Sequence, residues 1–233
     1  MSFAVNNIIG FGAAAAAGPP VLEAITTNSA DFSITLTANK PSGVVIGDLL
    51  VIFCANDDAT DTDQFIDDVT GWTFVDEAGT TSTDTHTAIY WRIADGTEAA
   101  TQDITAEKAR PWVTAYLRIS NADTTTPFVS TALVLEGAAT SYAQVWATTT
   151  VSNVLMIGAF SGSRSDAVLG VGVSVNQGFS VDEEWASDTD TSGVGAAIWH
   201  KTKDTAGSQA DMTLTPAAST SAILTALEIQ PPQ

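Results

Sequence analysis

The sequence predicts an all-β, jelly-roll-like sandwich that is built from a duplicated unit and preceded by an extended N-terminal arm. Short apolar runs bounded by turn residues recur along the 233-residue chain, which is typical of β-strands. The same order of runs occurs twice, which indicates an internal repeat. Residues 1–20 differ from everything after them because they contain no charged side chain.

The repeat is visible in three pairs of segments. GDLLVIFCAN, GWTFVDEAG and TAIYWRIADGTE return later as SNVLMIGAFS, GFSVDEEWA and GAAIWHKTKDT. Three aligned pairs keep a nearly constant spacing: Leu50 with Leu155, Gly71 with Gly178, and Ile89 with Ile198. We therefore divide the body, residues 21–233, into halves at about 26–123 and 128–230. Leu50 and Leu155 are predicted to lie on equivalent central strands and to be fully buried.

The remaining segments also read as strands. Apolar and polar residues alternate in FSITLT, WVTAYLRIS, AVLGVGVSVN and ILTALEIQ, as expected for strands with one buried face. ITAEKARP is the one place where a helical turn is an alternative, and Pro111 would end it. Residues 57–68 are so rich in aspartate that we expect an exposed loop there. Helix content is predicted to be minimal.

The charge balance limits the partners. Only 8 Lys and Arg residues stand against 27 Asp and Glu, which gives a formal charge of −19. Such a chain repels nucleic acid phosphates, so we exclude DNA and RNA as main partners. The single cysteine, Cys54, lies in an apolar run and is predicted to be a buried thiol, so no disulfide framework exists.

The N-terminal stretch MSFAVNNIIGFGAAAAAGPP has no basic residue, which argues against a cleaved secretory signal. Its asparagines and glycines also interrupt any run long enough to span a membrane. A flexible terminus and a first strand within its own domain are open alternatives. We favour an assembly arm on a neighbouring subunit, because its large apolar side chains need burial. These residues are Phe3, Val5, Ile8, Ile9 and Phe11.

Motifs for catalysis are missing from the sequence. There is no G-x-S-x-G, H-E-x-x-H, glycine-rich phosphate loop or C-x-x-C. His86 and His200 do not align in the repeat and have no second ligand at metal-site spacing, so we expect structural or surface roles for both. Adjacent carboxylates point to opposite faces of a strand. The sequence therefore predicts a protein that is not an enzyme and has no cofactor.

One segment resembles part of a calcium loop. Asp188, Asp190 and Ser192, followed by Gly193, read D-x-D-x-S-G, in which alternate oxygens converge and the glycine permits a sharp turn. The position of the closing bidentate glutamate is occupied by Trp199. An acidic hairpin is the alternative interpretation, and Ca²⁺ at these three residues stays a hypothesis.

Four motifs carry a resemblance to a known family. P-S-G-x-x-x-G-D-L-L-V, G-W-T-F-V-D, Y-W-R-I-A-D-G-T-E and A-Y-L-R-I-S-N-A-D-T-T-T-P-F resemble a widespread group of β-sandwich domains in tailed bacteriophages and bacterial surface proteins. The resemblance covers Thr26 to about Ile229. It implies that Trp72 is a core aromatic and that Tyr90–Arg92 belong to a strand. It also implies a virion component.

From this resemblance we expect a bacteriophage structural protein that is assembled into the virion in the host cytoplasm. A capsid decoration protein that docks on the major capsid protein fits best, because the body is compact and lacks a repetitive shaft. A tail or fibre subunit is the alternative, as is an adhesin domain that binds a host-surface glycan. A homo-oligomer is expected. Six tryptophans are possible sugar platforms, although most should be core: Trp72, Trp91, Trp112, Trp146, Trp185 and Trp199.

Overall fold

The computed structural model describes residues 18–57, 65, 69–80, 85–164, 174–186, 193–216 and 220–233. Within these ranges every regular element is a β-strand and no helix occurs, which confirms the all-β prediction. The strands are β1 (Val21–Asn39), β2 (Leu49–Asn56), β3 (Thr73–Thr80), β4 (Thr85–Ile93), β5 (Thr101–Ser120), β6 (Phe128–Ala139), β7 (Tyr142–Gln144), β8 (Val154–Arg164), β9 (Ser174–Val175), β10 (Ser180–Ala186), β11 (Gly193–Lys203), β12 (Met212–Thr215) and β13 (Thr220–Ile229).

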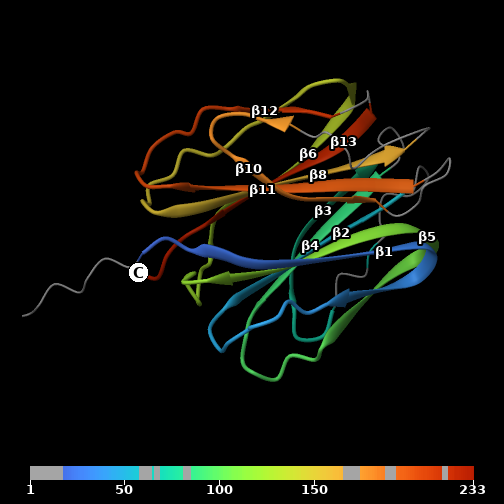
Figure 1. The fold of residues 1–233 in the computed structure, drawn as a ribbon, viewed down its shortest axis with the longest axis horizontal. Helices are drawn as coiled ribbons and strands as arrows, with labels where there is room; N and C mark the ends of the chain where they lie inside the picture. Colours follow the sequence, from blue (N-terminus) through green and yellow to red (C-terminus); the bar gives the residue numbers. More distant parts are fainter. Residues whose placement is uncertain are drawn as a thin grey trace, which may run out of the picture.

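Two five-stranded antiparallel sheets form the body (Figure 1). The first has the order β1-β5-β2-β4-β3 and uses only the first half of the chain. The second has the order β10-β11-β8-β13-β6 and uses only the second half. In reverse, the order of the second sheet is β6-β13-β8-β11-β10. If β6, β8, β10, β11 and β13 are matched in chain order to β1, β2, β3, β4 and β5, this is the strand order of the first sheet. The central strand β8 then corresponds to the central strand β2.

The two sheets pack face to face around a shared core. Leu49, Val51 and Phe53 of β2 enter this core from one side, and Leu155 and Ile157 of β8 enter it from the other. At the edges, β1 contacts β10 and β3 contacts β6. β6 corresponds to β1, and β10 corresponds to β3. The two edge contacts are therefore equivalent: in each, a strand of the β1 type from one half meets a strand of the β3 type from the other half. The two subunits of an isologous dimer meet in the same way.

The outer face of the first sheet is covered by its own long strands. β1 and β5 pair along nearly their whole length, from Val21 opposite Ser120 to Asn39 opposite Thr101. The register shifts near Ser33, where this ribbon bends, and the far part folds back over the sheet (Figure 1). A second core lies beneath it, which includes Leu50, Ile52 and Cys54.

The ribbon corrects one expectation. Residues 104–111 are part of β5 and not a helical turn. Pro111 is tolerated inside this strand because it lies at the bend, where the register passes from Trp112 opposite Ala30 to Arg110 opposite Ser33 and leaves the proline unpaired. The carbonyl of Pro111 accepts a hydrogen bond from the Asp57 backbone at 3.1 Å.

A small separate sheet covers the second half. β7, β12 and β9 form it in that order, and Tyr142, Met212 and Leu214 close a third core against the outer face of β8, β11 and β13. The pairing of β12 with β7 is the counterpart of the pairing between the far parts of β5 and β1. We expected a strand around residues 169–175. Its last two residues lie within the described ranges and form β9.

Leu50 and Leu155 are both buried on central strands, as predicted. Their side chains nevertheless face different cores, because Leu50 points to the outer core of the first half and Leu155 to the shared core. The register pairs Leu49 with Ile119, and Leu155 with Ile229. Leu49 is therefore the structural counterpart of Leu155, one residue away from the sequence alignment.

Two buried polar features complete the core. Cys54 is a buried free thiol, as predicted, and its burial raises the pKa of the thiol well above the usual value. The hydroxyls of Thr87 on β4 and Ser161 on β8 form a buried hydrogen bond of 2.6 Å between the halves. A polar pair in an apolar interface favours one registration of the two sheets, since sliding would leave both hydroxyls unsatisfied.

Candidate functional site

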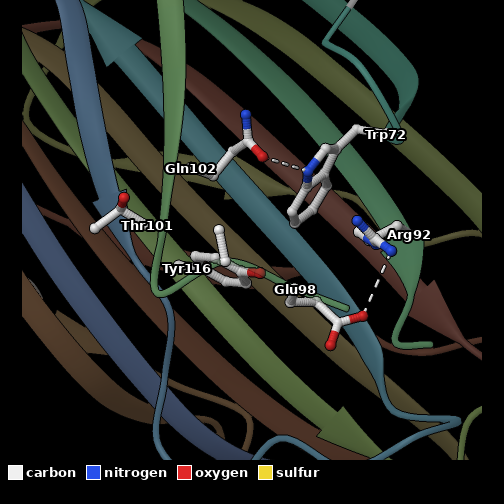
Figure 2. A pocket seen from close by; sticks show the side chains of 7 residues that line it. Trp72, Arg92, Glu98, Thr101, Gln102 and Tyr116 are labelled. Carbon is white, nitrogen blue, oxygen red and sulfur yellow. Dashed lines mark hydrogen bonds and ion pairs between the residues drawn. The ribbon is translucent and has the colours of Figure 1, made fainter. Parts of the chain in front are cut away.

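A pocket lies between the first sheet and the folded-back part of the β1–β5 ribbon. It is a small cavity of about 20 Å³, which is room for about one water molecule. Its lining comes from the residue before β3, the end of β4, the following loop and both parts of β5 (Figure 2). The lining residues are Trp72, Arg92, Glu98, Ala99, Thr101, Gln102 and Tyr116.

Trp72 is fixed in place on one side of the pocket. Its backbone amide donates to the Val69 carbonyl at 2.9 Å, closing a turn in which Gly71 has a φ of 80° that favours glycine. Its indole Nε1 donates to Gln102 Oε1 at 2.9 Å, and its ring meets the Tyr116 ring edge-on at 5.5 Å. The core aromatic that the family resemblance implied is thus a half-buried, oriented side chain, which packs against the second core.

Arg92 faces Trp72 and is held by two carboxylates. Its Nη2 lies 3.0 Å from Asp95 Oδ2 and 3.4 Å from Glu98 Oε1. Glu98 Oε1 also accepts the Asp95 backbone amide at 2.6 Å. The hydroxyl and amide of Thr97 bind the Asp95 carboxylate, and these contacts lower the pKa of Asp95. The guanidinium charge is therefore compensated inside the protein.

Tyr116 lies at the base of the pocket and is buried. Burial, followed by the negative charge of Glu98, raises the pKa of Tyr116 to about 12. The phenol therefore keeps its proton at neutral pH.

The same place in the second half is built differently. The register equates Arg92 with Lys201 and the Trp72 region with Phe179. Lys201 Nζ donates to the Gln177 carbonyl at 2.6 Å and lies 5.5 Å from the centre of the Phe179 ring. Trp146 stacks on Phe179 at 5.2 Å with 10° between the rings. A tryptophan thus covers the aromatic face.

A second surface is the end of the sandwich that holds the start of β1 and the C-terminus (Figure 1). The Asn121 side chain donates there to the Pro19 carbonyl at 3.0 Å. Val21, Val45 and Ile46 are 45%, 57% and 75% exposed there. We call this end, marked by these three residues, the terminal face.

The charges near the terminal face are paired. Arg118 Nε donates to Asp48 Oδ2 at 2.6 Å, and Asp48 Oδ2 also accepts the Val45 amide at 2.9 Å. The Arg92 cluster lies on the adjoining strand end. This end therefore combines three exposed apolar side chains with charged side chains that are paired within the protein.

Several predicted site residues lie outside the described ranges. These are the arm residues Phe3, Val5, Ile8, Ile9 and Phe11, and the calcium candidates Asp188, Asp190 and Ser192. Most of the acidic segment 57–68 also lies outside them. Across the described ranges, no group of three or more His, Cys, Asp and Glu side chains is placed to hold a metal ion.

The two histidines occupy different environments. His86 is fully buried, with Nδ1 3.8 Å from Glu77 Oε1. His200 is partly exposed, and its Nδ1 lies 2.7 Å from Asp182 Oδ2. This contact raises the pKa of His200, with the hydrogen bond as the larger cause and the charge of Asp182 as a further one. Both arrangements are those of structural residues.

The tryptophans divide into core and half-buried side chains. Trp112, Trp146 and Trp199 are buried, while Trp72 and Trp91 are partly buried. Sequence reasoning included Trp72 among the possible platforms but missed Glu98, Gln102 and Tyr116. The motif Y-W-R-I-A-D-G-T-E contains the loop that brings Glu98 to Arg92, but nothing in the sequence indicates that the ribbon folds back.

Comparisons with protein-family models, with curated proteins and with solved structures give no match to this chain. In the part of the chain that the structure describes, no helix is long and apolar enough to cross a membrane.

Proposed function

We propose that this protein is a non-enzymatic structural component of a bacteriophage virion, and specifically a capsid decoration protein that docks on the major capsid protein through residues 1–20. The observation that carries this proposal is the terminal face. The uncharged segment precedes β1 in the chain, and β1 starts at the end of the body where Val21, Val45 and Ile46 are exposed, so docking through this segment would bring these side chains close to the partner.

The proposal includes a duplicated jelly-roll body. In the second half the chain alternates between the large sheet and the outer cover, passing from β6 to β7, β8, β9, β10 and β11, then β12 and β13. In the first half, β1 and β5 each belong to both the large sheet and its cover. Phe65 forms an isolated β-bridge with Ala106, and the matching position in the second half is the pairing of β9 with β12. Alternation between two sheets is typical of a jelly roll, and the matched strand orders support duplication.

Charge also supports docking by one end. A body with a formal charge of −19 is repelled by its own copies at long range. An uncharged arm lets the protein attach without bringing two acidic surfaces together. Ordering the arm costs about 1 kcal/mol or more per residue, which cancels much of the gain from burial. A single arm should bind weakly, and many copies on a symmetric particle would add avidity.

The test uses purified particles. Mass spectrometry should detect the protein in them, and cryo-electron microscopy should place it on the capsid. Deletion of residues 2–17 should leave cooperative unfolding unchanged and abolish incorporation. Normal incorporation of the truncated protein would refute the arm. Localisation to the tail would favour the alternative, a tail or fibre subunit.

A matched pair of variants separates the arm's side chains from its length. Serine at Phe3, Val5, Ile8, Ile9 and Phe11 should block incorporation. Serine at the run of alanines, residues 13–17, should weaken it much less, because methyl groups bury little apolar area. Equal effects of the two sets would contradict docking through the large side chains.

A further inference from the structure

We propose that the inner face of each large sheet selects the unlike half as its partner and rejects the like half of a second copy of this chain. The selective elements are the hydroxyl pair of Thr87 and Ser161 and the difference in volume between Phe53 and Ala159. This goes beyond the proposed virion role and does not depend on it. It concerns which surface each half accepts when many copies of the chain fold side by side.

The backbone alone does not choose between like and unlike halves. The two sheets have matching strand orders, and the edge contacts of β1 with β10 and of β3 with β6 are equivalent. Near the middle, β4 contacts β8 and β2 contacts β11, and these contacts are equivalent in the same way. An interface with this twofold relation is self-complementary, so the first halves of two copies could face each other along the same lines. The side chains must therefore make the choice.

Four buried side chains mark the place where this choice is made. Ala55 on β2 lies directly opposite Thr87 on β4, and Ser161 on β8 lies directly opposite Ala196 on β11. The register makes Ala55 the counterpart of Ser161, and Thr87 the counterpart of Ala196. Each half thus carries one hydroxyl, but at opposite positions of the matched pair.

The two hydroxyls satisfy each other only across unlike halves. Thr87 Oγ1 and Ser161 Oγ lie 2.6 Å apart and are buried. If two first halves met in the same arrangement, each Thr87 would face the methyl group of Ala55. Two second halves would likewise set each Ser161 against Ala196. A buried hydroxyl without a partner keeps the full cost of its desolvation, so both like pairings are disfavoured.

Side-chain volume acts in the same direction. Phe53 lies opposite Ile89, and Ala159 lies opposite Ile198, so the register makes Phe53 and Ala159 counterparts. Both belong to the shared core. The unlike interface holds one phenylalanine and one alanine at these positions, whereas like halves would bring together two phenylalanines or two alanines. Excess volume strains a packed core, and missing volume leaves a cavity.

The hydroxyl pair should contribute more to selectivity than to stability. Apolar side chains of similar shape at both positions can be nearly as stable as the hydrogen-bonded pair, whereas loss of one partner leaves the other unsatisfied. Thr87→Val and Ser161→Ala should each lower the urea midpoint of unfolding, and the double variant should recover most of the loss. A double variant less stable than both single variants would contradict this.

The decisive experiment traps like pairing in the full chain. Ser29 on β1 and Asp76 on β3 are exposed and lie on opposite edge strands of the first sheet, about 19 Å apart at about 4.8 Å per strand. Between two paired first halves, β1 of one copy would meet β3 of the other, as β1 meets β10 within the chain. Chains with Ser29→Cys and Asp76→Cys are refolded from urea at high concentration and treated with a short bismaleimide. Covalent dimers are measured on a denaturing gel, and the buried Cys54 does not compete.

The double variant Thr87→Val and Ser161→Ala should raise the covalent dimer about threefold to tenfold over the same cysteine pair in the otherwise unaltered chain, because like halves no longer leave hydroxyls unpaired. The exchanged pair, Thr87→Ser with Ser161→Thr, keeps the hydrogen bond and should stay at the background level.

A second route keeps the test decisive if the apolar variant does not fold. Ala55→Ser with Ala196→Thr gives like halves their missing hydroxyl partners and should also raise the covalent dimer. A background level of dimer in whichever of these variants folds, or an equal rise in the exchanged pair, would refute the selectivity.

Discussion

The two halves differ most clearly at one cross-strand pair on their central strands. Tyr90 lies opposite Ile52 in the first half, and Trp199 lies opposite Gly158 at the matched position in the second. A Cβ atom on Gly158 would lie 2.1 Å from Trp199 Nε1. The larger aromatic ring is thus accommodated by removal of the opposite side chain. The space between the strands limits the summed volume of the two facing side chains, and that volume can be divided between the two strands in different ways.

The covers of the two halves show a second difference. The first half uses continuous strands that bend, whereas the second breaks each into two, β6 and β7, and β12 and β13. The bend leaves the pocket with Trp72 and Gln102 on its walls. In the second half, Trp146 fills the corresponding space. This small cavity and the stacked pair of Trp146 and Phe179 therefore go with different connections in the two halves.

Removal of a leucine from the shared core should give the largest loss of stability. Leu49→Ala and Leu155→Ala should each lower the free energy of unfolding by about 2 to 5 kcal/mol, because both leave a cavity between the sheets. Chemical denaturation with a single transition is the measurement. The comparison of the halves would fail if one variant were nearly neutral, since matched positions should be similarly packed.

Gly158→Ala should destabilise the second half by about 1 to 3 kcal/mol, because the added methyl group would meet the Trp199 ring. Gly137→Ala on β6 is the control. Among the described residues other than its own chain neighbours, no atom lies within 4 Å of the added Cβ there, so this variant should be neutral or slightly stabilising. Thermal or denaturant unfolding distinguishes the two, and equal effects would contradict the volume exchange.

Opposite charges at matched positions sharpen the comparison further. The register equates Arg118 with Glu228. Arg118 is paired with Asp48 at 2.6 Å, so Asp48→Asn should cost about 1 to 3 kcal/mol. Glu228 is buried, and burial raises the pKa of its carboxyl while Lys203 lowers it. Glu228→Gln should therefore cost less than Asp48→Asn at neutral pH in denaturant unfolding. A larger cost would show that Glu228 contributes through its charge.

The smallest expected effect is a pH dependence of the free energy of unfolding, which comes from the pair of His200 and Asp182. The matching positions in the first half hold no histidine. The contact with Asp182 raises the pKa of His200 above 6.5. The stabilisation is therefore fully present below pH 6.5 and is lost as the pH rises through the folded-state pKa. Because the pair is partly exposed, we expect less than about 1 kcal/mol. Denaturant unfolding at pH 6 and pH 8 measures it, and His200→Gln should remove this part of the pH dependence.

Sequence patterns alone determined much of the fold. Apolar runs located the central strands β2 and β8, alternation located the second part of β5 and β13, and the repeated order of motifs divided the chain where the two sheets divide. They also determined that Cys54 is buried. These features depend on short-range periodicity and on burial, which a single strand already carries.

Register and the pocket were decided by tertiary structure. Every residue from Leu49 to Ala55 is apolar, so the run has no alternation that would say which face Leu50 occupies, and the alignment with Leu155 slipped by one residue. Pro111 suggested an end to a helical turn, but the bend in the ribbon left it unpaired inside β5. The pocket brings Trp72 to Gln102 and Tyr116 only because β5 folds back over its own sheet. Such contacts between residues far apart in the chain arise from packing, which local sequence does not encode.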